Sequence, residues 1–259
     1  MDLIVFGGQS NMQGQSECLS ENDVVKDAYE YKWLTDEVVP LKNPVGEDIT
    51  YEETCGSVFS EEADQADWLQ KHVTGSACFG HTNLVPAFCR AYTQISGRNV
   101  TAVHIAKGST VIADWLPGSR GYEILVKKAA AARKKVNPDR VFFVWLQGES
   151  DAIFKSTAGY YKEALNRFCD ALKKEIGICV FGLIRVGKFT NDERDEQIMA
   201  AQNEICRENP DFMMLTDIAA AMYEQPVYMN PYVQGHYSAK GLEKLGREAG
   251  KALAEGCML

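Results

Sequence analysis

The stretch Leu3-Ile4-Val5-Phe6-Gly7-Gly8-Gln9-Ser10-Asn11-Met12 decides the predicted fold of this 259-residue chain. Its first four residues form a short apolar run, which is typical of a buried strand, and the glycine pair that follows indicates a turn. Ser10 and Asn11 then bring polar side chains directly after the strand. A strand that is apolar throughout favours a parallel sheet whose two faces are both covered by helices.

Further along the chain, apolar strands alternate with amphipathic helices. Strands are predicted at residues 31–34, 99–105, 141–146, 178–184 and 212–215, and helices at 84–95, 122–136, 160–174, 192–207 and 238–253. Ser238 fits the N-cap position of the last helix. This alternation predicts a flavodoxin-like three-layer α/β/α sandwich with a parallel sheet, and the length suits a single domain over residues 1–259.

The segment from about residue 17 to 80 is irregular and acidic. Fifteen acidic and three basic residues lie between Glu17 and Asp67, whereas the whole chain has a net charge of −9. The acidity is therefore local, and we interpret the segment as a solvated insertion into the domain. This charge does not favour nucleic acid as a partner.

The sequence favours a cytoplasmic protein without a membrane partner. It has no run of about 18 apolar residues and no basic region of the kind that begins a secretory leader. The eight cysteines are expected to be free and mostly buried thiols. The group formed by His72, Cys78, His81 and Cys89 fits no paired-ligand spacing, so we expect no metal site and no cofactor.

Polar turns that contain glycine follow several of the predicted strands. They comprise residues 8–12, 107–110, 147–151 and 234–238. The carboxyl ends of parallel strands meet at one edge, where ligands bind, so we expect these turns to lie together. They supply a hydroxyl, an imidazole, carboxylates and amide donors, which are the groups that acyl transfer requires. Each residue alone is explained as well by a cap, a turn or a solvated charge, and only their joint occurrence favours a site.

Within these turns, Ser10 is the candidate nucleophile and His236 is the candidate base, because imidazole accepts protons near neutral pH. The backbone N–H groups of Ser10 and Gly108 and the side-chain amide of Gln147 are candidate donors to an oxyanion. Ser10 lies in Gly-x-Ser-x-Met and follows the first strand, which disfavours the α/β-hydrolase fold. The sequence contains no Gly-x-Gly-x-x-Gly and no Walker A motif, so nucleotide binding has no support.

The motifs together resemble the SGNH-hydrolase superfamily, and more narrowly its sialate O-acetylesterase and acetylxylan-esterase branch. The matching stretches are Gly8-Gln9-Ser10-Asn11-Met12, Gly108-Ser109-Thr110, Gln147-Gly148-Glu149-Ser150-Asp151 and Gly235-His236, in an order that runs from residue 4 to about 250.

This resemblance implies that Ser10 is the nucleophile, that His236 is the base, and that Gly108 and Gln147 hold the oxyanion. It also implies a sugar-facing platform at Trp115, for which a core tryptophan is the alternative. Asn11 and Asp151 are the other candidate substrate-binding residues.

The acid that would orient His236 is the least defined part of the predicted site. Many relatives carry an Asp three residues before the catalytic His, where this chain has Val233. Glu149 is the first candidate to replace it, followed by Asp151 and Asp217. A Ser–His dyad, in which a backbone carbonyl orients His236, is the alternative, since the acid mainly holds the tautomer and stabilises the imidazolium.

The predicted activity is therefore the hydrolysis of O-acetyl esters of a carbohydrate, such as xylan or sialic acid, through an acyl-enzyme on Ser10. One alternative is a lipase- or thioesterase-type member of the same superfamily that acts on another small acyl ester. The other is a carbohydrate-binding homologue with weak turnover, which Val233 makes conceivable.

Overall fold

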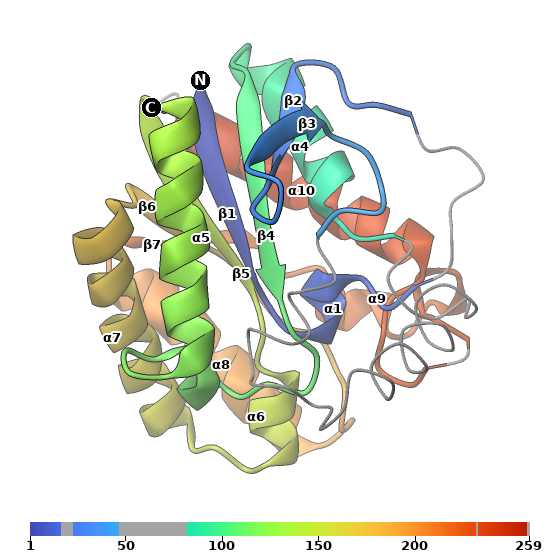
Figure 1. The fold of residues 1–259 in the computed structure, drawn as a ribbon. Coiled ribbons are helices and arrows are strands. Elements are labelled where there is room, and N and C mark those ends of the chain that lie inside the picture. Colours follow the sequence, from blue (N-terminus) through green and yellow to red (C-terminus); the bar gives the residue numbers. More distant parts are fainter. Residues whose placement is uncertain (17–22, 47–81, 232, 258–259) are drawn as a thin grey trace, which may run out of the picture.

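The computed structural model describes residues 1–16, 23–46, 82–231 and 233–257. Within these ranges, seven strands form one sheet in the order β3-β2-β4-β1-β5-β6-β7 (Figure 1). The strands are β1 (Asp2–Gly8), β2 (Ala28–Lys32), β3 (Glu37–Pro40), β4 (Val100–Ala106), β5 (Arg140–Leu146), β6 (Val180–Ile184) and β7 (Phe212–Thr216). Neighbouring strands run parallel, except that β3 is antiparallel to β2.

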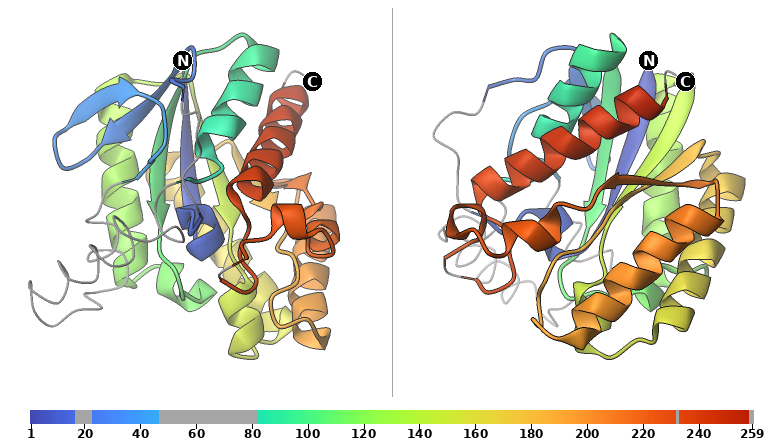
Figure 2. Two further views of the ribbon diagram at one scale, coloured as in Figure 1. Left: turned by 90° about the vertical axis from the view of Figure 1, so that its right-hand side faces the viewer. Right: turned by 180° about the vertical axis from the view of Figure 1, so that it is seen from behind.

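Helices cover both faces of the sheet, as Figures 1 and 2 show. On one face α4 (Val85–Ser96) packs against α10 (Ala239–Gly256), and on the other α5 (Arg120–Val136), α7 (Ala158–Ile176) and α8 (Glu193–Glu208) pack in succession. The connections hold the short segments α1 (Ser10–Gln13), η2 (Ile112–Trp115), α6 (Glu149–Ile153), α9 (Ala219–Met222) and η3 (Pro226–Tyr228). This is the predicted three-layer α/β/α arrangement with a mostly parallel sheet.

The core forms where the sequence is apolar without interruption. The side chains of β1 from Leu3 to Phe6 are fully buried, as are Phe143 and Trp145 of β5. Phe143 also packs against Phe168 of α7, with ring centroids 5.4 Å apart in an edge-to-face arrangement. Both faces of the central strands are therefore sealed by side chains from the helices, which is the burial that parallel sheets require.

The edge hairpin differs from the prediction of one strand at residues 31–34. Two strands are present there, β2 and β3, and most residues of β3 are exposed. An exposed edge strand has little burial pattern to reveal it, because its stability comes from the ladder to β2. Of the predicted acidic insertion at about 17–80, the structure describes residues 23–46; residues 17–22 and 47–80 lie outside the described residues, and so do His72, Cys78 and His81.

No helix in the described ranges combines the length and the apolar character that a membrane crossing needs. No group of three or more His, Cys, Asp or Glu side chains in those ranges is placed to hold a metal ion. The described cysteines are free thiols, with Cys89 and Cys169 buried and Cys179 exposed.

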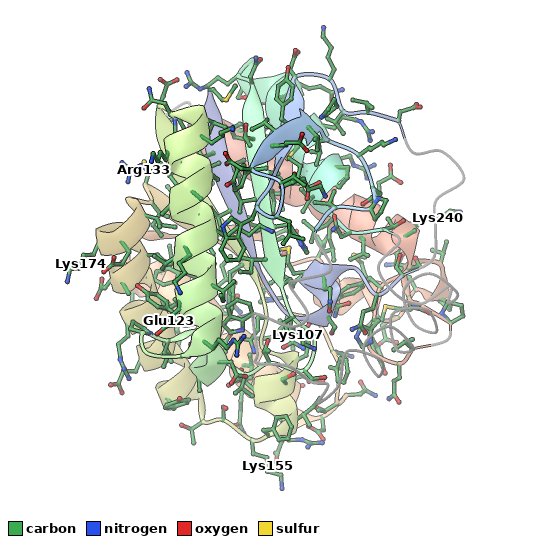
Figure 3. The ribbon with its side chains drawn as sticks, viewed as in Figure 1. Lys107, Glu123, Arg133, Lys155, Lys174 and Lys240 are labelled. Atoms are coloured by element: carbon green, nitrogen blue, oxygen red, sulfur yellow. The ribbon has the colours of Figure 1, made fainter. Side chains whose placement is uncertain are left out.

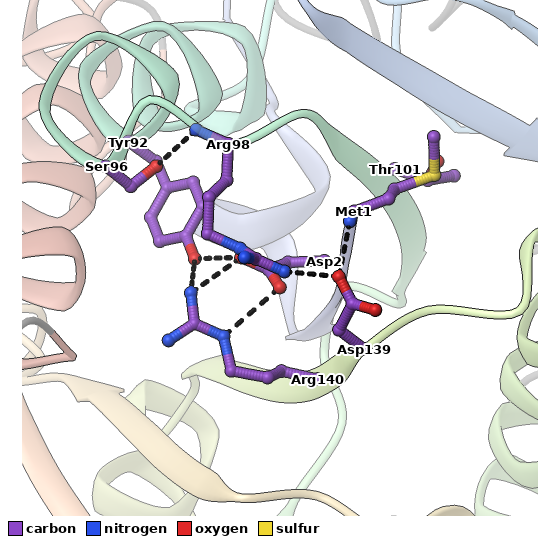
Figure 4. A network of polar contacts seen from close by, with 8 residues as sticks. All are labelled: Met1, Asp2, Tyr92, Ser96, Arg98, Thr101, Asp139 and Arg140. Atoms are coloured by element: carbon purple, nitrogen blue, oxygen red, sulfur yellow. Dashed lines mark hydrogen bonds and ion pairs between the residues drawn. The ribbon is translucent and has the colours of Figure 1, made fainter.

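The two ends of the sheet carry different chemistry. At the amino ends, the buried carboxylate of Asp2 accepts hydrogen bonds from Tyr92 (2.5 Å), Arg98 (2.8 Å) and Arg140 (2.8 Å), as Figure 4 shows. Burial alone would raise the pKa of Asp2, but these hydrogen bonds outweigh it and lower the pKa to about 2. This cluster joins β1, α4 and β5 far from the strands' carboxyl ends.

Charged side chains lie both on the helices and near the strand ends, as the labelled residues in Figure 3 show. Arg133 of α5 and Lys174 of α7 lie on the outer side of their helices in Figure 3, whereas Lys107 lies near the carboxyl ends of the strands. The Arg133 guanidinium also donates a hydrogen bond to the carbonyl of Ile176, at the end of α7 (3.0 Å). Arg133 therefore joins α5 to the end of α7, whereas Lys128 of α5 is buried.

Candidate active site

The candidate site begins where β1 and β5 end side by side. Gly8 has a φ of 152°, and a Cβ atom there would lie 2.1 Å from the carbonyl oxygen of Leu146, so only glycine allows this approach. The next residue, Gln9, joins the same two ends, because its Oε1 accepts the N–H of Ser150 (3.1 Å). In a doubly wound sheet this is the topological switch point, where ligands bind.

Ser10 and His236 meet at this point although they are 226 residues apart in the chain. His236 Nε2 lies 2.8 Å from Ser10 Oγ, and both side chains are buried. His236 Nδ1 lies 2.9 Å from the carbonyl oxygen of Gln234. A carbonyl oxygen only accepts hydrogen bonds, so Nδ1 carries the proton and Nε2 presents its lone pair to the serine. This tautomer is the one that a general base needs.

Burial lowers the pKa of His236 below its ordinary value of 6.5, and the bond to the Gln234 carbonyl opposes this only in part. Imidazole is therefore held neutral in the resting site at neutral pH. A neutral base beside a serine hydroxyl is ready to accept the serine proton.

Glu149 does not take the position of the orienting acid that the sequence predicted. Its Oε1 accepts a hydrogen bond from Asn11 Nδ2 at 2.8 Å, whereas His236 Nδ1 is bonded to the Gln234 carbonyl. Burial raises the pKa of Glu149, and the hydrogen bond from Asn11 opposes that rise. Glu149 therefore contacts the histidine segment, residues 235–237, only through another side chain.

Asn11 makes that indirect contact. Its Nδ2 also lies 3.3 Å from the carbonyl oxygen of Gly235, and its Oδ1 accepts the N–H of Tyr237 at 3.2 Å. The amide of Asn11 thus holds the backbone on both sides of His236, and Glu149 fixes which way that amide faces. In this arrangement Asn11 holds the histidine segment instead of facing a substrate, which differs from its predicted role.

The other two carboxylates considered in the sequence are also bonded elsewhere. Asp151 accepts from Ile112 N (2.8 Å), Gln147 Nε2 (2.6 Å) and Ser156 Oγ (2.7 Å), so it joins η2 to α6, and its side chain is fully buried. Asp217 is largely exposed and pairs with Arg185 at 3.8 Å. The dyad alternative, with His236 oriented by a backbone carbonyl, is the geometry that the structure has.

Gln147 is not available as an oxyanion donor. Its Nε2 donates to the carbonyl of Thr110 (3.0 Å) and to Asp151 (2.6 Å), and its side chain is fully buried. The hydroxyl of Tyr161 lies 3.1 Å from its Oε1. Both amide protons of Gln147 are therefore used inside the protein, and the predicted role at position 147 is corrected to a structural one.

Gly108 lies beside Ser10 as predicted, but its N–H is already bonded. A Cβ atom at position 108 would lie 3.5 Å from Ser10 Cβ, which places the glycine against Ser10. The N–H of Gly108 donates to Gln13 Oε1 at 3.0 Å. Gln13 was not singled out in the sequence, because no helix was predicted over residues 10–13 to bring its side chain to the same face as Ser10.

Trp115 is a core residue and not a sugar-facing platform. Its side chain is fully buried, its Nε1 donates to Thr110 Oγ1 at 3.0 Å, and its ring packs edge-to-face on Trp145 at 5.5 Å. A ring enclosed in this way cannot stack on a ligand. Of the two alternatives for Trp115, a sugar-facing platform and a core residue, the structure has the core residue.

Phe189 is a site residue that the sequence did not reveal. Its ring packs edge-on against the His236 imidazole, with centroids 5.5 Å apart. It also covers Gly235, where φ is 73° and a Cβ atom would lie 2.3 Å from the Phe189 ring. The loop that carries Phe189 is fixed by buried Asp195, whose carboxylate accepts the N–H groups of residues 189, 190 and 191.

Comparisons with known proteins agree with this fold. An X-ray structure of an Arabidopsis thaliana protein superposes with a TM-score of 0.71 at 17% identity, covering 98% of both chains. The structure of NanS superposes with a TM-score of 0.68 at 12% identity, covering 100% of this chain and 98% of that one. A structure described as a novel carbohydrate acetylesterase from Xanthomonas citri gives 0.56 at 16% identity, over 98% of this chain and 57% of that one. At these identities, the superpositions establish the shared fold.

The sequence comparisons identify the family. A probable carbohydrate esterase from Arabidopsis thaliana is 26% identical over 216 residues, which cover 79% of this chain and 77% of that protein. A family model described as carbohydrate esterase, sialic acid-specific acetylesterase, matches residues 1–255. The resemblance that the strand-end motifs indicated is thereby confirmed, and the chain belongs to this carbohydrate esterase family.

Proposed function

We propose that the protein is a serine esterase that removes O-acetyl groups from a carbohydrate through an acyl-enzyme on Ser10. The observation that carries this proposal is the 2.8 Å contact between Ser10 Oγ and His236 Nε2, with Nδ1 committed to the Gln234 carbonyl. A buried hydroxyl that faces the lone pair of a neutral imidazole is the arrangement that activates serine.

Acylation follows from this geometry. Ser10 Oγ attacks the acetyl carbonyl carbon while its proton passes to His236 Nε2, and the carbonyl oxygen becomes an oxyanion. The N–H of Ser10, at the first position of α1, has no acceptor within the helix and is one donor to that oxygen. When the tetrahedral intermediate collapses, the sugar oxygen leaves with the proton from His236, and acetyl-Ser10 remains.

Deacylation repeats the same proton transfers with water. A water molecule attacks the acetyl carbonyl and gives a proton to His236 Nε2. Collapse of the second tetrahedral intermediate releases acetic acid, which ionises to acetate in water, and the proton of His236 returns to Ser10 Oγ. No redox step occurs, and His236 accepts and returns the proton in each half-reaction.

Glu149 and Asn11 act in this scheme as positioning residues. Glu149 orients the Asn11 amide, and Asn11 bonds to the backbone at Gly235 and Tyr237. Together with the Gln234 carbonyl, they hold the imidazole ring toward Ser10 without a carboxylate on Nδ1. The site is therefore proposed to work as a dyad with a structural support behind it.

Family membership supports the choice of an acetylated carbohydrate as substrate. The matching family model is described as a sialic acid-specific acetylesterase, and one structural neighbour is described as a carbohydrate acetylesterase. Acetylated xylan and O-acetylated sialic acid are therefore the first natural substrates to test.

The test measures acetate release from 4-nitrophenyl acetate, acetylated xylo-oligosaccharide and O-acetylated sialic acid. Ser10→Ala is expected to lose at least ~10³-fold in kcat/KM, on the scale of removing a nucleophile. Mass spectrometry of the quenched wild-type enzyme is expected to show one added acetyl group that Ser10→Ala lacks. Near-normal hydrolysis by Ser10→Ala would rule out the assignment.

The same measurements separate the two alternatives. A rate that rises with acyl length on 4-nitrophenyl esters, with no release from either acetylated sugar, would instead assign a lipase- or thioesterase-type activity. Binding of an acetylated sugar without any acetate release would assign a carbohydrate-binding protein.

A further inference from the structure

The amide of Gln13 is placed beside the nucleophile by the first short helix. Gln13 follows Ser10 by three residues in α1, so the two side chains project from the same face of the helix. Gln13 is buried, with 6% of its surface exposed. A polar side chain so close to the serine and so little exposed needs partners for all its polar atoms.

Only half of this amide is used inside the protein. Gln13 Oε1 accepts the N–H of Gly108 at 3.0 Å, but Gln13 Nε2 is buried and has no hydrogen-bond partner in the part of the chain that the structure describes. The opposite amide orientation would bring Nε2 against the Gly108 N–H, donor against donor, so the bond from Gly108 sets which atom is which. A buried donor without an acceptor is unfavourable, so its presence calls for an explanation such as a ligand that supplies the acceptor.

The proposed mechanism needs a side-chain hydrogen-bond donor to the oxyanion, and Gln13 Nε2 is placed to supply it. The N–H of Gly108 has a single proton, which Gln13 Oε1 takes, and both amide protons of Gln147 are used by Thr110 and Asp151. Of the three predicted donors, Gly108 N–H and the Gln147 amide are therefore not free for an oxyanion, which leaves the N–H of Ser10. Among the buried side chains that the structure describes, Gln13 Nε2 is the unmet donor next to Ser10 in α1.

We propose that Gln13 is the side-chain donor of the oxyanion hole and that Gly108 acts through it. The N–H of Gly108 holds the amide by its oxygen and polarises it, which strengthens the Nε2–H bond as a donor. The acceptor that Nε2 lacks is the acetyl carbonyl oxygen, which becomes negatively charged when Ser10 attacks. This inference rests on the proposed serine esterase activity and adds one catalytic residue to it.

Gln13→Glu is the sharpest variant for testing this role. It keeps the shape of the side chain and an oxygen that accepts from Gly108, and it removes the Nε2 protons. Hydrolysis of 4-nitrophenyl acetate is expected to lose about 10²-fold or more in kcat, on the scale of one oxyanion donor, with KM changed by less than about threefold. Gln13→Leu, which removes the amide without adding charge, is expected to lose kcat to a similar extent.

Two controls make the result decisive. Gln197→Glu adds the same charge on an exposed position of α8 and is expected to leave kcat unchanged. Circular dichroism and thermal unfolding establish that each variant is folded before its kinetics are read. A folded Gln13→Glu or Gln13→Leu with wild-type kcat would overturn the proposal.

A Gln13 variant with a kcat above that of the wild type would also overturn the proposal. Such a result would mean that Gln13 Oε1 keeps the Gly108 N–H from binding the oxyanion. Either result requires an active wild-type enzyme. If the wild type hydrolyses none of the esters, the proposed function fails, and that outcome is distinct from an active wild type whose rate is indifferent to position 13.

Discussion

Phe189 packs edge-on against the imidazole of His236, with ring centroids 5.5 Å apart and planes at 75°. In a site where the Nδ1 atom is bonded to a backbone carbonyl, this aromatic contact both excludes water from the histidine and limits rotation of its ring. It also explains why the pKa of His236 is lowered, because burial is the largest cause of that shift.

Phe189→Ala is therefore expected to raise the pKa of His236 toward 6.5 and to lower kcat by about 10- to 100-fold through misplacement of the ring. Histidine NMR titration measures the pKa without any substrate, and ester hydrolysis gives kcat. Phe154→Ala, which removes a phenylalanine that is 69% exposed, is the matched control and should change neither quantity. An unchanged His236 pKa in folded Phe189→Ala would contradict the role of this contact.

The dependence of kcat/KM on pH follows from the same shift. Neutral His236 is the active form, and its pKa lies below 6.5, so activity should persist on mildly acidic titration and fall only below pH 6.5. A carboxylate on Nδ1 would raise the pKa of the histidine and move this midpoint upward. A midpoint at or above 6.5 would therefore favour an orienting acid and count against the dyad.

Two substitutions at Glu149 distinguish a positioning residue from a triad acid. Glu149→Gln keeps an oxygen for Asn11 and should retain kcat within about threefold, whereas loss of the charge from a triad acid costs about 10⁴-fold. Glu149→Ala leaves the Asn11 amide without its partner and should lose about 10- to 100-fold. The His236 pKa is the second measurement, and it should be the same in Glu149→Gln as in the wild type. A loss of kcat near 10⁴-fold in Glu149→Gln would instead show that Glu149 acts as the acid of a triad.

The Asp2 cluster, in which Asp2 accepts hydrogen bonds from Tyr92, Arg98 and Arg140, predicts how the free energy of unfolding changes at low pH. Its folded pKa of about 2 lies below the ordinary 3.8, so its contribution is complete above about pH 4 and is lost as the pH falls toward 2. The shift corresponds to about 2 kcal/mol. Urea unfolding across this range should show a smaller loss of stability in Asp2→Asn than in the wild type, with Asp170→Asn, at an exposed position, as the control.

Asp2→Asn should also be less stable at neutral pH by about 3 kcal/mol, because Arg98 and Arg140 lose their buried partner. Its kcat, measured where the variant is folded, should be that of the wild type, since the cluster lies at the opposite end of the strands from Ser10. A stability curve that matches the wild type between pH 4 and 2 would contradict the assignment of the low pKa to Asp2.

The sheet could be predicted because its strands are buried on both faces, which leaves continuous apolar runs such as Leu3 to Phe6. β3 could not, since its residues are mostly exposed and it is held by backbone bonds to β2. The same contrast applies to Trp115. A tryptophan after a polar turn fits a platform or a core equally well in sequence, and the contact with Trp145 decides between them.

Ser10 and His236 could be predicted as partners because parallel strands bring their ends to one edge. The choice between Gln147 and Gln13 could not, because it depends on which carbonyl oxygens lie within reach of each amide. Thr110 and Asp151 saturate Gln147, and Gly108 binds only the oxygen of Gln13. A prediction of helix over residues 10–13 would have placed Gln13 beside the nucleophile.

The contact between Ser10 and His236 spans 226 residues, and the segment that delivers the histidine follows the last strand of the sheet. During synthesis, Ser10 leaves the ribosome early and meets no base until residues 234–237 have emerged and joined Asn11. Domains fold as units as the chain is made, so the proposed nucleophile has no base beside it on the nascent chain. Catalytic competence is then a property that the protein acquires only on completing its fold.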